Sequence, residues 1–112
     1  MADLAQSAVT IERAWTEGGP SGKDLSCRQV TLVLTAQGTL TNKIPAAVLS
    51  LQKIEQASPA QTDDNSALYL AAPSYDGANL LLYDVSNGTD ATRDAPADIT
   101  DTLRLVVKGI PA

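Results

Sequence analysis

The chain has 112 residues, enough for one domain with its own hydrophobic core, and 44% of them are hydrophobic, which argues against a disordered chain. The net charge is −5 and the eight basic residues are scattered, so we expect no binding to nucleic acid, which requires clustered lysine and arginine. No apolar run is long enough to span a membrane. The start, MADLAQSAV, lacks the basic and apolar regions of a secretory signal.

The first predicted elements are an arm and a strand. We expect residues 1–7 to form an N-terminal arm that is loose unless a partner orders it, and residues 8–112 to form a single β domain. From Ala8 onward, side chains alternate with a period of two, which indicates a strand. In this strand Val9, Ile11 and Trp15 are expected to face the core.

The middle of the chain predicts strands joined by turns. Glu17–Asp24 has turn chemistry, and Leu25–Thr35 is rich in β-branched residues, so we expect it to pair back on the first strand. Pro45 predicts one helical turn over Ala46–Leu49. A strand over Leu51–Ala57 follows, and AQTDDNS is expected to be a loop.

The C-terminal part predicts a hairpin and a final strand. The hairpin strands are Ala67–Ala72 and Asn79–Val85, joined by a turn over 73–77 that contains Asp-Gly. After a polar connection, the strand over 102–108 places Leu103, Leu105 and Val107 on one face.

Together these elements predict an all-β fold: a small antiparallel β-sandwich or barrel, jelly-roll-like, of about six to seven strands with one short helical turn. The predicted core consists of apolar residues from every strand. They are Val9, Ile11, Trp15, Val30, Leu32, Leu34, Leu49, Ile54, Leu68, Leu70, Leu82, Leu103, Leu105 and Val107.

The glycine-rich stretch AWTEGGPSGKD is the nearest approach to a nucleotide motif. A phosphate-binding P-loop needs a glycine five residues before its Gly-Lys pair and a Ser or Thr after it, but Glu17 and Asp24 occupy these positions. We therefore predict an exposed loop that contacts a partner and whose deletion weakens binding without unfolding the domain. Its candidate contact residues are Thr16, Glu17, Gly18, Gly19, Pro20, Ser21, Gly22 and Lys23.

The sequence gives little indication of catalysis. The chain has no histidine, which removes the usual general base and the commonest metal ligand. Its single cysteine, Cys27, excludes an internal disulfide, fits a reducing cytosol, and lies in a predicted strand, where packing is the simpler role. We expect no enzymatic activity, no catalytic residue and no cofactor. The oxygen-rich loops at 63–64 and 90–101 raise a structural calcium site as an alternative to simple solvation, but no EF-hand spacing exists.

One aromatic residue is expected at the surface. Tyr75 precedes Asp76 and a glycine in the predicted turn, and exposed aromatic residues favour interfaces, so Tyr75 and Asp76 are further candidate partner contacts. Tyr69 and Tyr83 lie on the two hairpin strands, where cross-strand packing is the simplest account. An aromatic platform for sugar, built from Trp15 and the tyrosines, is the alternative.

Four segments, AWTEGG, KIPAAVLSL, DNSALYLAAPSYDGANLLLYDV and DTLRLVVKG, resemble small β-rich structural proteins of tailed bacteriophages. The resemblance covers most of the chain, from about Val9 to Gly109. It implies a capsid decoration (cement) protein, made in the host cytoplasm, that sits on the outer capsid surface of the virion. The implied partner is the major capsid protein and the implied assembly is a homotrimer, with no nucleic acid and no membrane involved. The alternative is a tail, baseplate or fibre-associated β module that contacts host surface glycan.

Overall fold

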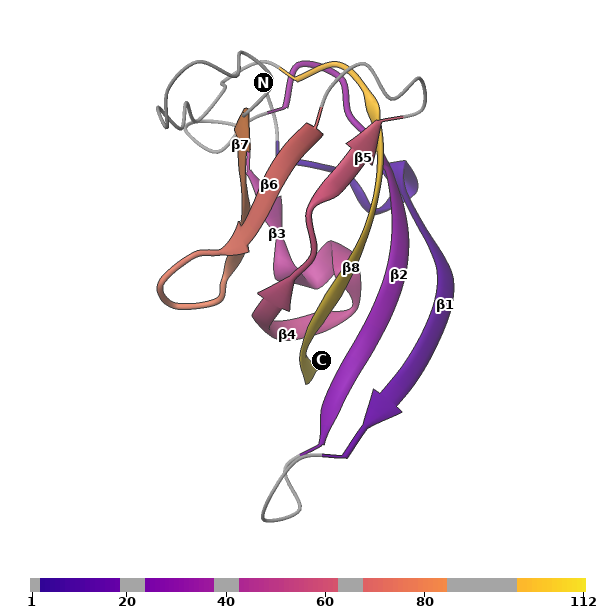
Figure 1. Cartoon of the computed structure of the whole chain (residues 1–112), viewed down its shortest axis with the longest axis vertical. Helices are drawn as coiled ribbons and strands as arrows, with labels where there is room; N and C mark the ends of the chain where they lie inside the picture. Colours follow the sequence, from indigo (N-terminus) through magenta and orange to yellow (C-terminus); the bar gives the residue numbers. More distant parts are fainter. Residues whose placement is uncertain (1–2, 19–23, 38–42, 63–67, 85–98) are drawn as a thin grey trace.

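The structure, a computed structural model, describes residues 3–18, 24–37, 43–62, 68–84 and 99–112. These residues form one antiparallel β-sheet that curls into a half-barrel (Figure 1). The prediction of an all-β fold is confirmed, and the single curled sheet is closer to the barrel than to a sandwich of two sheets. The helical segments of the described chain are two short 3-10 turns.

The strands are β1 (Val9–Glu17), β2 (Leu25–Val33), β3 (Ile44–Pro45), β4 (Leu51–Ala57), β5 (Ala60–Thr62), β6 (Leu68–Pro73), β7 (Asn79–Asp84) and β8 (Thr102–Pro111), and the 3-10 turns are η1 (Gln6–Ala8) and η3 (Ala46–Leu49). The order across the sheet is β1-β2-β8-β5-β6-β7-β3, and β4 also pairs with β8. The predicted helical turn, the predicted β4 and the predicted β6–β7 hairpin are all confirmed.

Strands β4 and β5 share one edge of β8, and Ser58 joins them. Its backbone N–H donates to the carbonyl oxygen of Val106 at 2.9 Å, and its hydroxyl oxygen accepts from the backbone N–H of Val106 at 2.9 Å. Sequence reasoning missed β3 and β5, because strands of two or three residues are defined by distant partners and carry little periodicity of their own.

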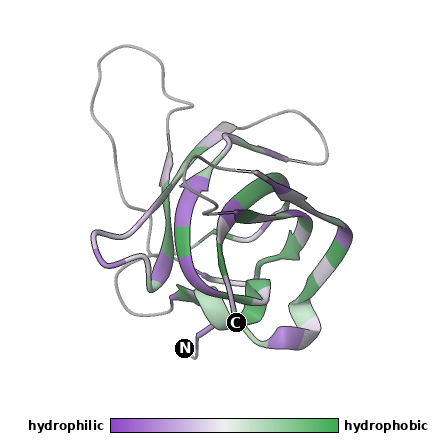
Figure 2. Cartoon of the chain, turned by 90° about the horizontal axis from the view of Figure 1, so that it is seen from below, coloured by the Kyte–Doolittle hydropathy of each residue, from purple (hydrophilic) through white to green (hydrophobic). Residues whose placement is uncertain are grey.

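The core lies inside the curl of the sheet, where Val30 and Leu32 of β2 face Leu105 and Leu103 of β8 in register. Seen from below, hydrophobic and hydrophilic residues alternate along the strands that enclose this interior (Figure 2). Most predicted core residues are buried: Val30, Leu32, Leu34, Leu49, Ile54, Leu82, Leu103, Leu105 and Val107. Val9 and Ile11 are half-buried against the core, and the side chain of Leu68 lies outside the described residues.

Trp15 is 39% exposed, so its predicted place in the core is wrong. The cause is a β-bulge: Ile11 lies opposite Val30, but Arg13 lies opposite the next residue of β2, so Glu12 is an inserted residue. A one-residue insertion moves all later side chains to the other face of the sheet. Trp15 therefore lies opposite Cys27, on the outer face.

Leu70 is also wrongly predicted, since it is 37% exposed while its neighbour Tyr69 is buried. Both faces of β6 are apolar in sequence, so alternation could not fix which one turns inward. The Tyr69 hydroxyl lies 3.2 Å from Asp101 Oδ2, which satisfies its polar end. On the paired strands β6 and β7, Tyr83 lies opposite Leu70 and Tyr69 lies opposite Asp84.

The N-terminal segment is not loose over residues 3–7, contrary to expectation. Leu4 is buried in the core, and its backbone N–H donates to the Lys43 carbonyl oxygen at 2.8 Å. The Lys43 backbone N–H in turn donates to Asp3 Oδ1 at 2.9 Å, and Gln6 Nε2 donates to the Val48 carbonyl oxygen at 3.0 Å. These contacts attach the segment to the core, to Lys43 just before β3, and to η3.

Candidate functional site

The turn between β6 and β7 presents Tyr75 to solvent with its side chain fully exposed, as the sequence predicts. The hairpin closes where the Ser74 backbone N–H donates to the Asn79 carbonyl oxygen, and the Gly77 N–H donates to the Ser74 carbonyl oxygen, both at 2.9 Å. The Ser74 hydroxyl donates to Asp76 Oδ1 at 2.8 Å and accepts from the Asn79 N–H at 3.1 Å. The backbone on both sides of Tyr75 is therefore held by hydrogen bonds.

The same turn is attached to the body of the domain. The Gly77 carbonyl oxygen accepts from the Ile54 backbone N–H of β4 at 2.8 Å, and the Ala78 carbonyl oxygen accepts from the Ala46 N–H at 2.9 Å. Gly77 has φ +72°, and a Cβ atom there would lie 2.9 Å from the Ile54 carbonyl oxygen. Glycine is required both by this φ and by the close approach of β4. The turn is thus a rigid platform for one exposed aromatic ring.

Asp76 contributes to this rigidity. Its carboxylate accepts from the Ala78 backbone N–H at 3.0 Å and from the Ser74 hydroxyl, and these two hydrogen bonds hold the pKa of Asp76 below its usual value. An ionised aspartate that accepts bonds within its own turn is a common turn stabiliser. Asp76, predicted as a contact residue, therefore also positions Tyr75.

The predicted loop after Trp15 begins later than expected. Thr16 and Glu17 belong to β1, where they lie opposite Ser26 and Leu25, so the strand runs two residues further than the turn chemistry suggested. Gly18 is exposed directly after the strand. The other candidate contacts of this loop, Gly19, Pro20, Ser21, Gly22 and Lys23, lie outside the described residues.

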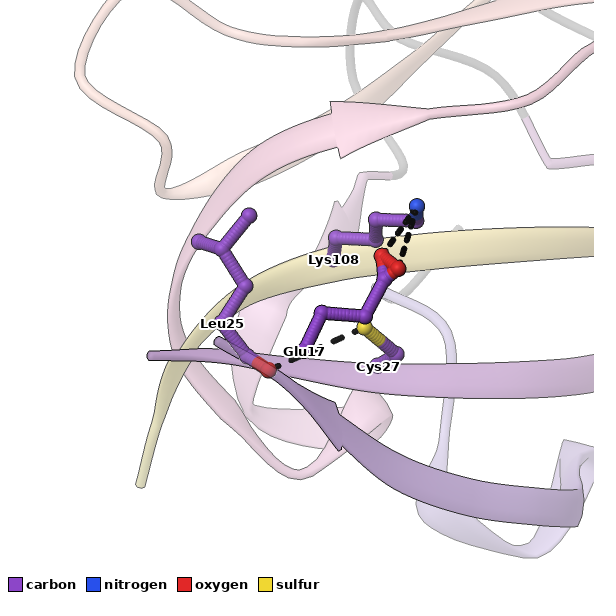
Figure 3. Close-up of polar contacts among 4 residues, drawn as sticks. All are labelled: Glu17, Leu25, Cys27 and Lys108. Carbon is purple, nitrogen blue, oxygen red and sulfur yellow. Dashed lines mark hydrogen bonds and ion pairs between the residues drawn. The ribbon is translucent and has the colours of Figure 1, made fainter. Parts of the chain in front are cut away.

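Glu17, Cys27 and Lys108 come together on the outer face of the sheet, from β1, β2 and β8 (Figure 3). Lys108 Nζ forms an ion pair with the Glu17 carboxylate and lies 3.1 Å from its Oε2. The hydrogen bond from Lys108 lowers the pKa of Glu17, and the same bond raises the pKa of Lys108. Both groups therefore stay charged across the neutral range.

Cys27 is fully buried beside this ion pair, yet it is not part of the main core cluster. Burial raises the pKa of the Cys27 thiol, and the negative charge of Glu17 adds to the effect. Its Sγ lies 3.7 Å from the Leu25 carbonyl oxygen, as a weak donor. A buried thiol with a raised pKa is a poor nucleophile, so the arrangement favours the predicted packing role.

The outer face of β1, β2 and β8 carries a shallow hollow of about 450 Å³, lined mainly by polar side chains that include Arg13, Gln29, Thr31 and Arg104. Glu12 Oε1, at its border, accepts from the Thr31 hydroxyl at 3.1 Å.

Within the described part of the chain, no group of three potential metal ligands lies together. The oxygen-rich stretches at 63–64 and 90–98 lie outside that part. No helix among the described residues has the length and apolar character that crossing a membrane requires.

Two features of these sites were not predicted from the sequence. The ion pair of Glu17 with Lys108 joins residues 91 positions apart, so no local pattern indicates it. The contact of Gly77 with β4 is likewise long-range. The spacing of Ser74 and Asp76 in PSYDG, by contrast, is a local signal for a hydrogen-bonded turn.

The chain matches no protein-family model, and no curated protein or solved structure is significantly similar to it. Its class is therefore defined by the fold alone, a small all-β domain built from one curled antiparallel sheet.

Proposed function

We propose that this chain is a non-enzymatic decoration (cement) protein of a tailed-bacteriophage head, which binds the outer surface of the major capsid shell and stabilises it. The proposal joins the resemblance of its sequence to virion proteins with one structural observation. That observation is the rigid β6–β7 turn, which presents Tyr75 fully to solvent.

The Tyr75 turn has the properties of a protein-binding anchor. Tyrosine is enriched at interfaces because its large ring buries apolar area while its hydroxyl finds a polar partner. Binding through a flexible loop loses affinity to the entropy of ordering that loop, whereas a turn held on both sides by hydrogen bonds avoids most of this loss. The bonds of Ser74 and Asp76 therefore favour an attachment role for Tyr75.

The remaining properties are compatible with such a role. A net charge of −5 keeps crowded copies soluble. Three copies around a three-fold axis of the shell would form the homotrimer that the resemblance implies. Assembly in the host cytoplasm suits a chain whose single cysteine is a buried thiol.

The direct test mixes the purified chain with undecorated phage heads and sediments the heads. The wild-type chain is expected in the pellet, and Tyr75→Ala is expected to remain largely in the supernatant. Leu70→Ala is the matched control, because Leu70 is an exposed apolar residue on β6 outside the turn, and it should pellet like the wild type. A wild-type chain that stays wholly in the supernatant would refute the decoration role.

The alternative, a tail, baseplate or fibre module that binds host glycan, is examined by two further measurements. Labelled antibodies on intact virions locate the chain on head or tail. A glycan array measures sugar binding directly, with Tyr75→Ala as the comparison. Tyr69 is buried and cannot join an aromatic sugar platform, which weakens this alternative.

A further inference from the structure

The two ends of the sheet differ in how well their edges are protected. At one end, β3 has two residues and finishes with Pro45. Short edge strands and edge prolines prevent pairing with other chains. At the other end, β1 has nine residues and no proline, and no described strand pairs with its outer edge (Figure 1). Strand β1 therefore exposes a long edge whose backbone groups can pair with a further strand.

The regular part of this edge begins after the bulge at Glu12 and spans Arg13–Glu17. Its alternate residues Arg13, Trp15 and Glu17 share the outer face, where Trp15 is 39% exposed and Arg13 is exposed. An aromatic side chain thus has a positive group two residues before it and a negative group two residues after it. This pattern is complementary to itself when the strand direction is reversed.

We propose that two copies of this chain associate through β1, antiparallel, with Trp15 of one copy opposite Trp15 of the other. In this register Arg13 of each copy lies opposite Glu17 of its partner, and Ala14 lies opposite Thr16. The contact has two-fold symmetry, so the Arg13–Glu17 pair occurs twice and the Trp15 pair lies on the symmetry axis. Aromatic pairs and opposite charges are the cross-strand combinations that stabilise antiparallel sheets.

Neighbouring registers lose this complementarity. Pairing centred on Arg13 places two like charges against each other, and pairing centred on Ala14 or Thr16 separates the two tryptophans.

Glu17 can accept from the partner's guanidinium without releasing Lys108, because a carboxylate has two oxygens and accepts several hydrogen bonds. Lys108 already holds the carboxylate on the outer face of the sheet, where the partner's Arg13 would meet it. The inference concerns two copies in solution and does not depend on the proposed attachment to a capsid.

The test measures the mass of the full chain over a concentration series by sedimentation equilibrium. An assembly with an even number of copies is expected, a dimer in the simplest case. The chain contains one tryptophan, so its emission should shift to shorter wavelength as the dimer forms and covers Trp15. Tyr75→Ala, a matched loss of an exposed aromatic residue outside β1, should leave both readouts unchanged.

Charge reversal tests the register. Arg13→Glu places carboxylates opposite each other, Glu17→Arg places guanidinium groups opposite each other, and each should raise the dissociation constant about tenfold or more. An equimolar mixture of the two variants should dimerise again, because every charged pair in the mixed dimer is then complementary. Trp15→Thr should also dissociate the dimer. Threonine favours β-strands, and this substitution retains the Glu17 carboxylate that pairs with Lys108.

The proposal is overturned by a chain that stays monomeric at every soluble concentration. It is also overturned if single charge reversals dimerise like the wild type, or if their mixture does not recover association. A trimer in solution contradicts it as well, because a two-fold contact gives an even number of copies.

Discussion

Truncation of Leu105 tests whether the two faces of β8 differ as the structure requires. Leu105 is 4% exposed and lies opposite Val30 inside the curl. Leu105→Ala removes three buried carbon groups at about 0.8 kcal/mol each, or about 2.4 kcal/mol of transfer free energy, and leaves a cavity that adds to it. We therefore expect the free energy of unfolding to fall by about 2–5 kcal/mol, a large part of the roughly 5–15 kcal/mol typical of such a domain.

Val106→Ala is the matched control on the next residue. Val106 is half-buried on the outer face, and its backbone bonds to Ser58 do not involve its side chain. Removing two carbon groups that are about half covered should cost roughly 0.8 kcal/mol. Urea unfolding at one fixed protein concentration measures both values, provided that the slope m is unchanged. Equal large losses would refute the reasoning, because they would show that both faces of β8 are buried.

Three further outcomes are expected. A Cβ atom at Gly109 would lie 1.9 Å from the Lys53 carbonyl oxygen, so Gly109→Ala should separate β4 from β8 and cost about 1–3 kcal/mol or more in urea unfolding; a neutral variant contradicts this contact. The bond from Lys108 lowers the pKa of Glu17 below 4.5, so its stabilisation is present above that value and is lost as pH falls through the lowered pKa. Glu17→Gln should therefore flatten the acid side of a stability–pH curve, and an unchanged curve would argue against the ion pair. The thiol of Cys27 should react slowly with an alkylating reagent in the native protein and rapidly in urea, whereas equal rates would show an accessible thiol.

The sequence predicted those parts of the fold that depend on local chemistry. The bounds of β4 follow from its flanking turns, the 3-10 turn follows from Pro45, and the inward face of β8 follows from the alternation of Leu103 and Leu105 with polar residues. The exposure of Tyr75 was predictable in the same way, because Asp-Gly chemistry fixes the turn that carries it.

What escaped prediction depends on pairing between distant segments. The bulge at Glu12 is a property of the β1–β2 register, and it reverses the face on which Trp15 lies. The side chain of Tyr69, and not that of Leu70, faces the core. This orientation depends on packing and on the hydrogen bond between Tyr69 and Asp101, 32 residues away. Leu4 lies in a short segment without regular alternation of apolar and polar residues, so periodicity could not reveal its burial.

The two proposed contacts lie on separate parts of the sheet, which gives the dimer a consequence for attachment. The Tyr75 turn belongs to β6 and β7, whereas the pairing edge is β1, with β2, β8 and β5 between them in strand order. A dimer through β1 would therefore carry two free turns on one body. Two linked anchors bind a repetitive surface more tightly than one, because the second contact forms at a high effective concentration. Arg13→Glu should then weaken retention on a shell through lost bivalency while leaving the affinity of each single turn intact, whereas Tyr75→Ala should abolish retention and leave the dimer in place.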